Sequence, residues 1–110
     1  MPVVLPRPAF IAAVAERIAW LAENRNEDHL DNFLASLAYV RDRIALNPEA
    51  GPPLKRDRAH ILRMRLFPRP LPYLVFYAHP TTYPIAEIYL VRLFGSGQNR
   101  AELDMSDWPW

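Results

Sequence analysis

The fold is decided by the stretch AHILRMRLFPRPLPYLVFYAHPTTYPIAEIYLVRLF, residues 59–94. Its opening, AHILRMRLF, places apolar residues at every second position, a period of two that is typical of a half-buried β-strand. The run Tyr73–Ala78 is almost wholly apolar and aromatic, which predicts a central strand, and Ile85–Phe94 predicts a third. Prolines separate the three segments and the connections are short, so we expect an antiparallel meander.

The chain before this stretch has a helical pattern in two segments. Residues 8–24 carry an apolar stripe made of Phe10, Ile11, Val14, Ile18 and Leu21. Residues 27–46 carry a second stripe made of Leu30, Phe33, Leu34, Leu37, Val40 and Ile44. Pro8 suits the first position of a helix, Asn26 is a suitable N-cap for the second one, and Asn47-Pro48 ends it. Only a short link joins the two segments, so we expect an antiparallel helical hairpin.

These elements predict an α+β domain with the order β–α–α–β–β–β. Val3–Leu5 adds a short edge strand before the helices, and a Pro/Gly loop over residues 47–54 precedes the meander. The helical hairpin then covers one face of a small antiparallel sheet. If Leu62 and its alternate neighbours face the helices, Arg63 and Arg65 point to the other face, which is open to water. We expect a single domain over residues 1–110, of which about 100–110 form a tail.

Composition excludes several classes of protein. The chain has 110 residues, of which 51% are hydrophobic, too many for a disordered chain. Cysteine is absent, which excludes a disulfide scaffold, a zinc ribbon, an iron–sulfur site and a thiol nucleophile. The sequence holds no apolar run long enough for a transmembrane helix. The run Ala9–Ala15 ends in Ala-Val-Ala, as signal peptides do, but it continues into a helical pattern, so we expect a helix there.

Charge is unevenly distributed along the chain, although the net charge is only +1. Residues 16–31 hold five acidic and two basic side chains, whereas residues 41–69 hold eight basic and three acidic ones. Twelve of the 13 basic residues are arginine, which binds planar anions in a bidentate way. The middle of the chain is therefore where an anionic target would bind. The candidate binding residues are Lys55, Arg56, Arg58, Arg63 and Arg65.

The order of elements resembles the RelE/ParE superfamily of toxins from bacterial type II toxin–antitoxin (plasmid stabilisation) systems. The features that carry the resemblance are an arginine in ILRMRLF, the motif PYLVFY at Pro72–Tyr77, and the last strand IAEIYLVRLFGS. The resemblance spans about Val3–Asn99. It implies a small cytoplasmic toxin that is neutralised by an antitoxin, which wraps the toxin with a helix or a strand.

Two activities occur within the family. RelE-like members enter the ribosome and cleave mRNA, whereas ParE-like members act on DNA gyrase and lack the nuclease residues. RNA cleavage needs a base for the 2′-hydroxyl, cations for the phosphate and an acid for the leaving oxygen. The candidate catalytic residues here are Arg63, Arg65, Tyr77, His79 and Arg92.

The C-terminal region departs from the nuclease pattern. RelE-like nucleases often carry a tyrosine or a His-Tyr pair near the C-terminus, and the tail RAELDMSDWPW has neither residue. Many relatives end the last strand with His-Gly-x-Arg-Asp, where this chain reads FGSGQN at residues 94–99. These departures favour a ParE-like inhibitor. The alternatives are a RelE-like mRNA endonuclease and an inactive, binding-only relative.

Other conspicuous residues have both a functional and a structural interpretation. Tyr73 and Tyr77 form either a base-stacking platform or part of the aromatic core. His79 is either a general base or a turn residue, and His60 has the same two interpretations. His29, among acidic residues, is either a metal ligand or part of a solvated helix start. The Trp108-Pro-Trp110 end indicates a contact surface. We expect neither a cofactor nor a metal ion.

Overall fold

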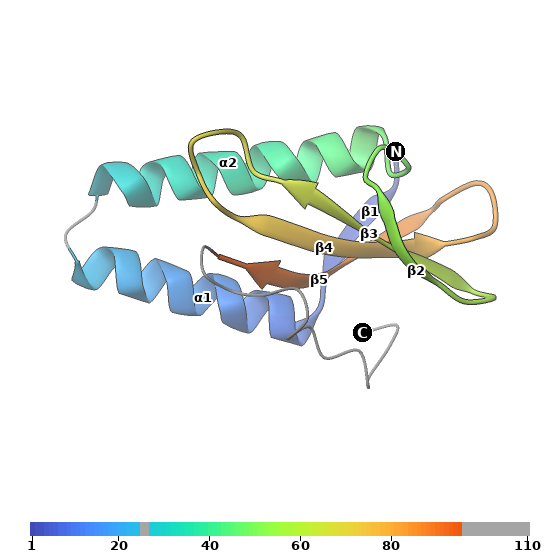
Figure 1. The fold of residues 1–110 in the computed structure, drawn as a ribbon, viewed down its shortest axis with the longest axis horizontal. Helices are drawn as coiled ribbons and strands as arrows, with labels where there is room; N and C mark the ends of the chain where they lie inside the picture. The colour runs from blue at the N-terminus through green and yellow to red at the C-terminus, as the bar shows by residue number, and fades with distance from the viewer. Residues whose placement is uncertain (25–26, 96–110) are drawn as a thin grey trace.

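A computed structural model describes residues 1–24 and 27–95. Their elements follow the order β1 (Val3–Pro6), α1 (Pro8–Glu23), α2 (Glu27–Leu46), β2 (Pro53–Arg56), β3 (His60–Leu66), β4 (Leu74–Pro80) and β5 (Glu87–Phe94). The two helices run antiparallel to each other, as Figure 1 shows. The α+β class and both predicted helices are confirmed. The proposed cap Asn26 and the tail with Trp108 and Trp110 lie outside the described residues.

Local sequence explains where the helices begin and end. Pro8 occupies the first turn of α1 after an extended Arg7, where a missing N–H costs nothing. Asn24 ends this helix, and its side-chain amide donates to the carbonyl of Trp20 at 2.8 Å. Glu27 and Asp28 lie in the first turn of α2 and Arg43 in its last turn, which places each charge at the favourable end of the helix dipole.

The sheet is larger than the sequence predicts, and it is mixed. Its order is β1-β5-β4-β3-β2. The meander of β3, β4 and β5 is antiparallel as expected, but β1 pairs with β5 in parallel. The strand β2, which begins within the predicted loop over residues 47–54 and was not predicted, adds to the sheet at the other edge. The prediction missed β2 because its four residues are all exposed and therefore leave no apolar pattern.

The main core lies between the helices and one face of the sheet. Its buried members are Phe10, Leu21, Phe33, Val40, Ile44, Phe67, Tyr73, Val75, Tyr77, Ile88, Leu90 and Leu93. Phe33 of α2 packs against the rings of Phe67 and Tyr73, at centroid distances of 5.7 and 5.1 Å. This aromatic group ties α2 to the segments that flank the β3–β4 connection.

The expected orientation of β3 is wrong. Arg63 lies opposite Tyr77 and Arg65 opposite Val75 on β4, and both β4 residues belong to the core under the helices. Cross-strand partners share a face, so the two arginines lie on the helix side of the sheet. Leu62 belongs instead to a second buried cluster on the opposite face, with Phe76, Ala78, Val91 and Phe94. That face therefore carries a buried apolar cluster and is not the water-exposed face that the sequence analysis expects. The prediction failed because strand alternation defines two faces of a strand but does not decide which of them the helices cover.

Candidate functional site

The sequence-predicted residues Arg63, Tyr77 and His79 come together on the helix side of β3 and β4. Arg63 Nε donates to His79 Nε2 at 2.9 Å. Its Nη1 donates to the carbonyl of Gly51 at 2.8 Å and to that of Glu49 at 3.3 Å. Arg63 therefore joins β4 to the loop that follows α2.

The Tyr77 side chain also binds this loop, through its hydroxyl group. Its hydroxyl donates to the carbonyl of Pro48 at 2.7 Å and accepts from the backbone N–H of Gly51 at 3.2 Å. The side chain is fully buried. Burial is the main cause that raises the pKa of Tyr77, while Arg63 and Arg65 act in the opposite direction. The phenol is therefore neutral and both its hydrogen-bonding roles are filled.

His79 is 2% exposed, and both its ring nitrogens are engaged. Nδ1 lies 2.8 Å from the carbonyl of Pro80, which can only accept, so Nδ1 carries the proton and donates it. Nε2 then accepts from Arg63. Burial, with a smaller effect from Arg63, lowers the pKa of His79, while the hydrogen bond to the Pro80 carbonyl and, to a lesser extent, Glu49 act in the opposite direction. The arrangement holds a neutral imidazole, and proton uptake at Nε2 would first require the loss of the Arg63 hydrogen bond.

The remaining cations do not gather at this network. Arg56 pairs with Ile61 on β3 and shares the helix side of the sheet with Arg63 and Arg65. Lys55 pairs with Leu62 and so belongs to the opposite face, and Arg58 lies in the turn between β2 and β3. Lys55, Arg56 and Arg58 are all exposed. The turn lies at the end of the molecule away from the α1–α2 connection (Figure 1).

Arg92, the third arginine of the nuclease hypothesis, lies across the sheet from the other two. It is opposite Phe76, which belongs to the cluster on the far face. Its Nη1 donates to the carbonyl of Val91 at 2.9 Å. One phosphate on one face therefore cannot reach all three arginines of the strands.

Three other candidates have mainly structural surroundings. Tyr73 is buried in the core. His60 is half-buried and lies edge-on to the ring of Tyr89 at 6.0 Å. His29 is exposed near the start of α2. Within residues 1–24 and 27–95, no group of three histidine, aspartate or glutamate side chains is placed to hold a metal ion.

No protein-family model matches the chain, and no curated protein matches it. No helix among the described residues is long and apolar enough to span a membrane.

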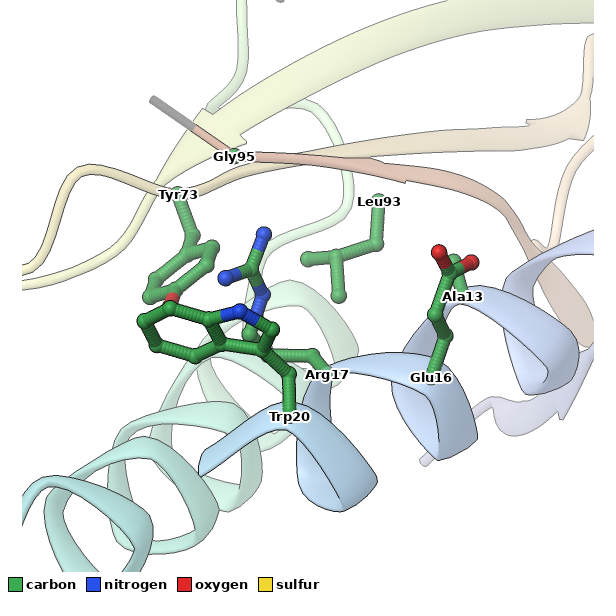
Figure 2. Close-up of a pocket in the computed structure, with 7 residues that line it drawn as sticks. All are labelled: Ala13, Glu16, Arg17, Trp20, Tyr73, Leu93 and Gly95. Carbon is green, nitrogen blue, oxygen red and sulfur yellow. The ribbon is translucent and has the colours of Figure 1, made fainter. Parts of the chain in front are cut away.

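A pocket of about 270 Å³ between α1 and the end of β5 was not predicted from the sequence. Its lining residues are Ala13, Glu16, Arg17, Trp20, Tyr73, Leu93 and Gly95, drawn in Figure 2. The guanidinium carbon of Arg17 lies 5.3 Å from the ring centroid of Trp20 and 5.5 Å from that of Tyr73. The spacing of Arg17 and Trp20 puts them on one side of a helix, but the sequence does not indicate that Tyr73 joins them.

A second hollow, of about 290 Å³, lies between β1 and α2. It is lined by Val4, Pro6, Phe10, Leu34, Leu37, Ala38, Arg41 and Leu90. Leu34 on its wall is 42% exposed. Within residues 1–24 and 27–95, β1 is also an edge strand that pairs with another strand only on its β5 side, so the apolar hollow adjoins a sheet edge.

Proposed function

We propose that this chain is the toxin of a type II toxin–antitoxin module, a cytoplasmic ParE-like growth inhibitor that acts by binding and is neutralised by a cognate antitoxin. The observation that carries the choice of binding over catalysis is the state of His79 and Tyr77. His79 has both ring nitrogens engaged, and the Tyr77 hydroxyl fills both its roles with loop backbone. Neither side chain is free to move a proton to or from a substrate.

The fold supports the family assignment through its order of elements. A helical hairpin precedes the meander, Arg63 lies on β3, and β5 ends just before Gly95. Apart from the additional strand β2, this order is the one expected from the resemblance.

The hollow beside β1 supports the antitoxin as a partner. An extended peptide can add a strand at a sheet edge and place alternate side chains in adjoining pockets. β1 offers such an edge, and the hollow next to it has a mainly apolar lining that includes Leu37 and Phe10. We assign this surface to the antitoxin.

The hairpin of β2 and β3 is the candidate surface for the cellular target. Lys55, Arg56 and Arg58 are exposed there, away from the hollow beside β1 at the opposite sheet edge. Two surfaces at opposite edges would let target binding and antitoxin binding be separated by mutation. Both DNA gyrase and the ribosome with its mRNA remain candidate targets.

The experiment that tests the proposal is pulse labelling after induction of the chain alone in bacteria. Labelled thymidine reports DNA synthesis and labelled amino acids report protein synthesis. If DNA synthesis stops first, the gyrase-directed inhibitor is supported. If protein synthesis stops first, the RelE-like endonuclease replaces it, and cleaved mRNA should then be mapped. If neither stops while the protein is folded, the chain is a binding-only relative.

Two variants test the role of the buried network directly. Tyr77→Phe and His79→Gln remove the hydroxyl and the imidazole without adding charge. For an inhibitor that acts by binding, each variant that still folds, as judged by circular dichroism, keeps its growth inhibition. Tyr39→Phe, an exposed tyrosine on α2, is the matched control. Loss of inhibition in a folded variant would favour the endonuclease.

A further inference from the structure

The pocket between α1 and β5 is built around a set of hydrogen-bond donors. The guanidinium of Arg17, the hydroxyl of Tyr73 and the indole N–H of Trp20 all belong to its lining. In the part of the chain that the structure describes, none of these three side chains donates a hydrogen bond to a protein acceptor. Arg17 is also only half-buried, so its cation is partly removed from water, and no carboxylate within residues 1–24 and 27–95 forms an ion pair with it.

The shape of the pocket favours a flat ligand. Figure 2 shows the guanidinium of Arg17 beside the rings of Trp20 and Tyr73, with Leu93 on the other side. The indole of Trp20 is 49% exposed, which leaves ring surface available for stacking. Arginine held against aromatic rings keeps its N–H edge free for a bidentate anion.

Glu16 supplies the single acidic side chain of the lining. Figure 2 shows its carboxylate near Ala13, on the far side of Leu93 from the ring of Tyr73. It forms no ion pair with Arg17. The pocket therefore offers an acceptor at one end and cationic and neutral donors at the other. A volume of about 270 Å³ is slightly below the usual range for small-molecule sites, which starts at about 300 Å³, so the pocket suits a ligand no larger than one base, one sugar and one phosphate.

We propose that this pocket binds a nucleoside monophosphate. The phosphate is held by Arg17 and the hydroxyl of Tyr73, the base stacks on the indole of Trp20, and Glu16 accepts from a ligand hydroxyl or amino group. This site does not depend on the toxin proposal, because its lining holds none of the residues assigned above to the buried network, the antitoxin surface or the target surface.

Isothermal titration calorimetry on the full chain tests the site with three probes: adenosine 5′-monophosphate, inorganic phosphate and adenosine. We expect the nucleotide to bind about tenfold or more tightly than either fragment, because only it uses both the ring surface and the guanidinium. Equal binding of adenosine and the nucleotide would remove the role of the anion and overturn the proposal. So would a folded protein that does not bind the nucleotide.

Two variants locate the binding. Arg17→Gln removes the cation, and we expect the affinity for the nucleotide to fall about tenfold or more. Gly95→Ala adds a Cβ that would lie 3.2 Å from Arg17 Nη2 and 3.4 Å from a ring carbon of Tyr73, so it narrows the pocket without changing its charge. We expect weaker nucleotide binding there too.

The controls are arginines elsewhere on the surface. Arg43→Gln on α2 and Arg56→Gln on β2 remove exposed cations that are not part of the pocket lining. We expect both variants to bind the nucleotide as the parent chain does. If Arg56→Gln loses binding while Arg17→Gln retains it, the nucleotide binds the hairpin and the pocket proposal is wrong.

Discussion

Gly51 is the residue at which the loop after α2 meets both β3 and β4. Its N–H donates to the Tyr77 hydroxyl and its carbonyl accepts from Arg63. A Cβ at this position would meet the Met64 carbonyl oxygen and lie 2.6 Å from the Tyr77 hydroxyl. Backbone forms part of this wall, so the contact cannot be relieved by a side-chain rotation, and glycine is required for space.

Gly51→Ala should therefore destabilise the chain. We expect the free energy of unfolding in denaturant to fall by about 1–3 kcal/mol, the usual cost of overpacking. Ala50→Ser changes an exposed neighbour and should change it by less than about 0.5 kcal/mol. Equal stability of Gly51→Ala and the parent would mean that the loop does not close over Tyr77 in this way.

His79 makes stability depend on pH. The pKa of His79 is lowered from its ordinary 6.5, mainly by burial. As the pH falls, the His79 imidazole takes up a proton near pH 6.5 in the unfolded chain but only at lower pH in the folded chain. The contribution of the neutral imidazole to the free energy of unfolding is therefore complete above about pH 6.5 and is lost as the pH falls through the folded pKa. Arg63 and His60 add to the lowering of the pKa, whereas the hydrogen bond to the Pro80 carbonyl and, more weakly, Glu49 oppose it.

The test is the free energy of unfolding at about pH 7.5 and about pH 5. We expect the parent chain to lose more stability on acidification than His79→Gln, which has no imidazole to protonate. His29→Gln removes an exposed histidine and should behave like the parent. A parallel decline in parent and His79→Gln would contradict the role given to His79.

At the scale of the elements, Phe33 provides the aromatic contacts between α2 and the segments around the β3–β4 connection. Phe33 is fully buried between Phe67 and Tyr73, whereas its neighbour Leu34 is 42% exposed beside β1. We expect Phe33→Ala to cost about 3–5 kcal/mol of unfolding free energy and Leu34→Ala no more than about 1 kcal/mol. Denaturant titration of the two variants compares them, and similar costs would contradict the packing described for α2.

The hairpin of β2 and β3 depends on its turn. The carboxylate of Asp57 accepts from the N–H groups of Ala59 and His60, both at 2.7 Å, as turn-forming aspartates do. We expect Asp57→Ala to speed amide hydrogen exchange at these two residues and to cost about 1 kcal/mol. Thr81→Val, which removes the hydroxyl donor to the carbonyl of Arg58, is a nearby control that should leave the exchange at His60 unchanged.

At the scale of the whole molecule, the sheet separates two kinds of surface. An apolar hollow adjoins β1 at one edge, and exposed cations lie along β2 and its turn at the other. The sheet and its core lie between these two edges, so we expect a partner bound at one edge to leave the other edge undisturbed.

The separation predicts the behaviour of a charge-reversed hairpin. The triple variant Lys55→Glu, Arg56→Glu and Arg58→Glu should fold, lose growth inhibition and still bind the antitoxin, because all three side chains are exposed. Growth curves and co-purification with the antitoxin measure the two properties. Simultaneous loss of both in a folded protein would contradict two separate surfaces. Unchanged inhibition would contradict the hairpin as the target surface.

The sequence by itself determined the local elements. Residues 27–46 form the predicted helix, and β3, β4 and β5 lie within one or two residues of the predicted strands at nearly every end. These elements are set by apolar periodicity and by prolines, which act over a few residues. The strand β2 carries no apolar pattern because its side chains are exposed, so it formed only where β3 offered a pairing edge.

Only the tertiary structure decided which side of the sheet each side chain meets. The alternation in β3 was visible in the sequence, but its register against Val75 and Tyr77 placed Arg63 under the loop after α2 rather than in open water. The same register placed Arg63 against His79. The contact of Arg17 with Tyr73 came instead from the packing of α1 on the sheet. A period of two is the same for both faces of a strand, and the face that becomes buried depends on contacts between distant segments.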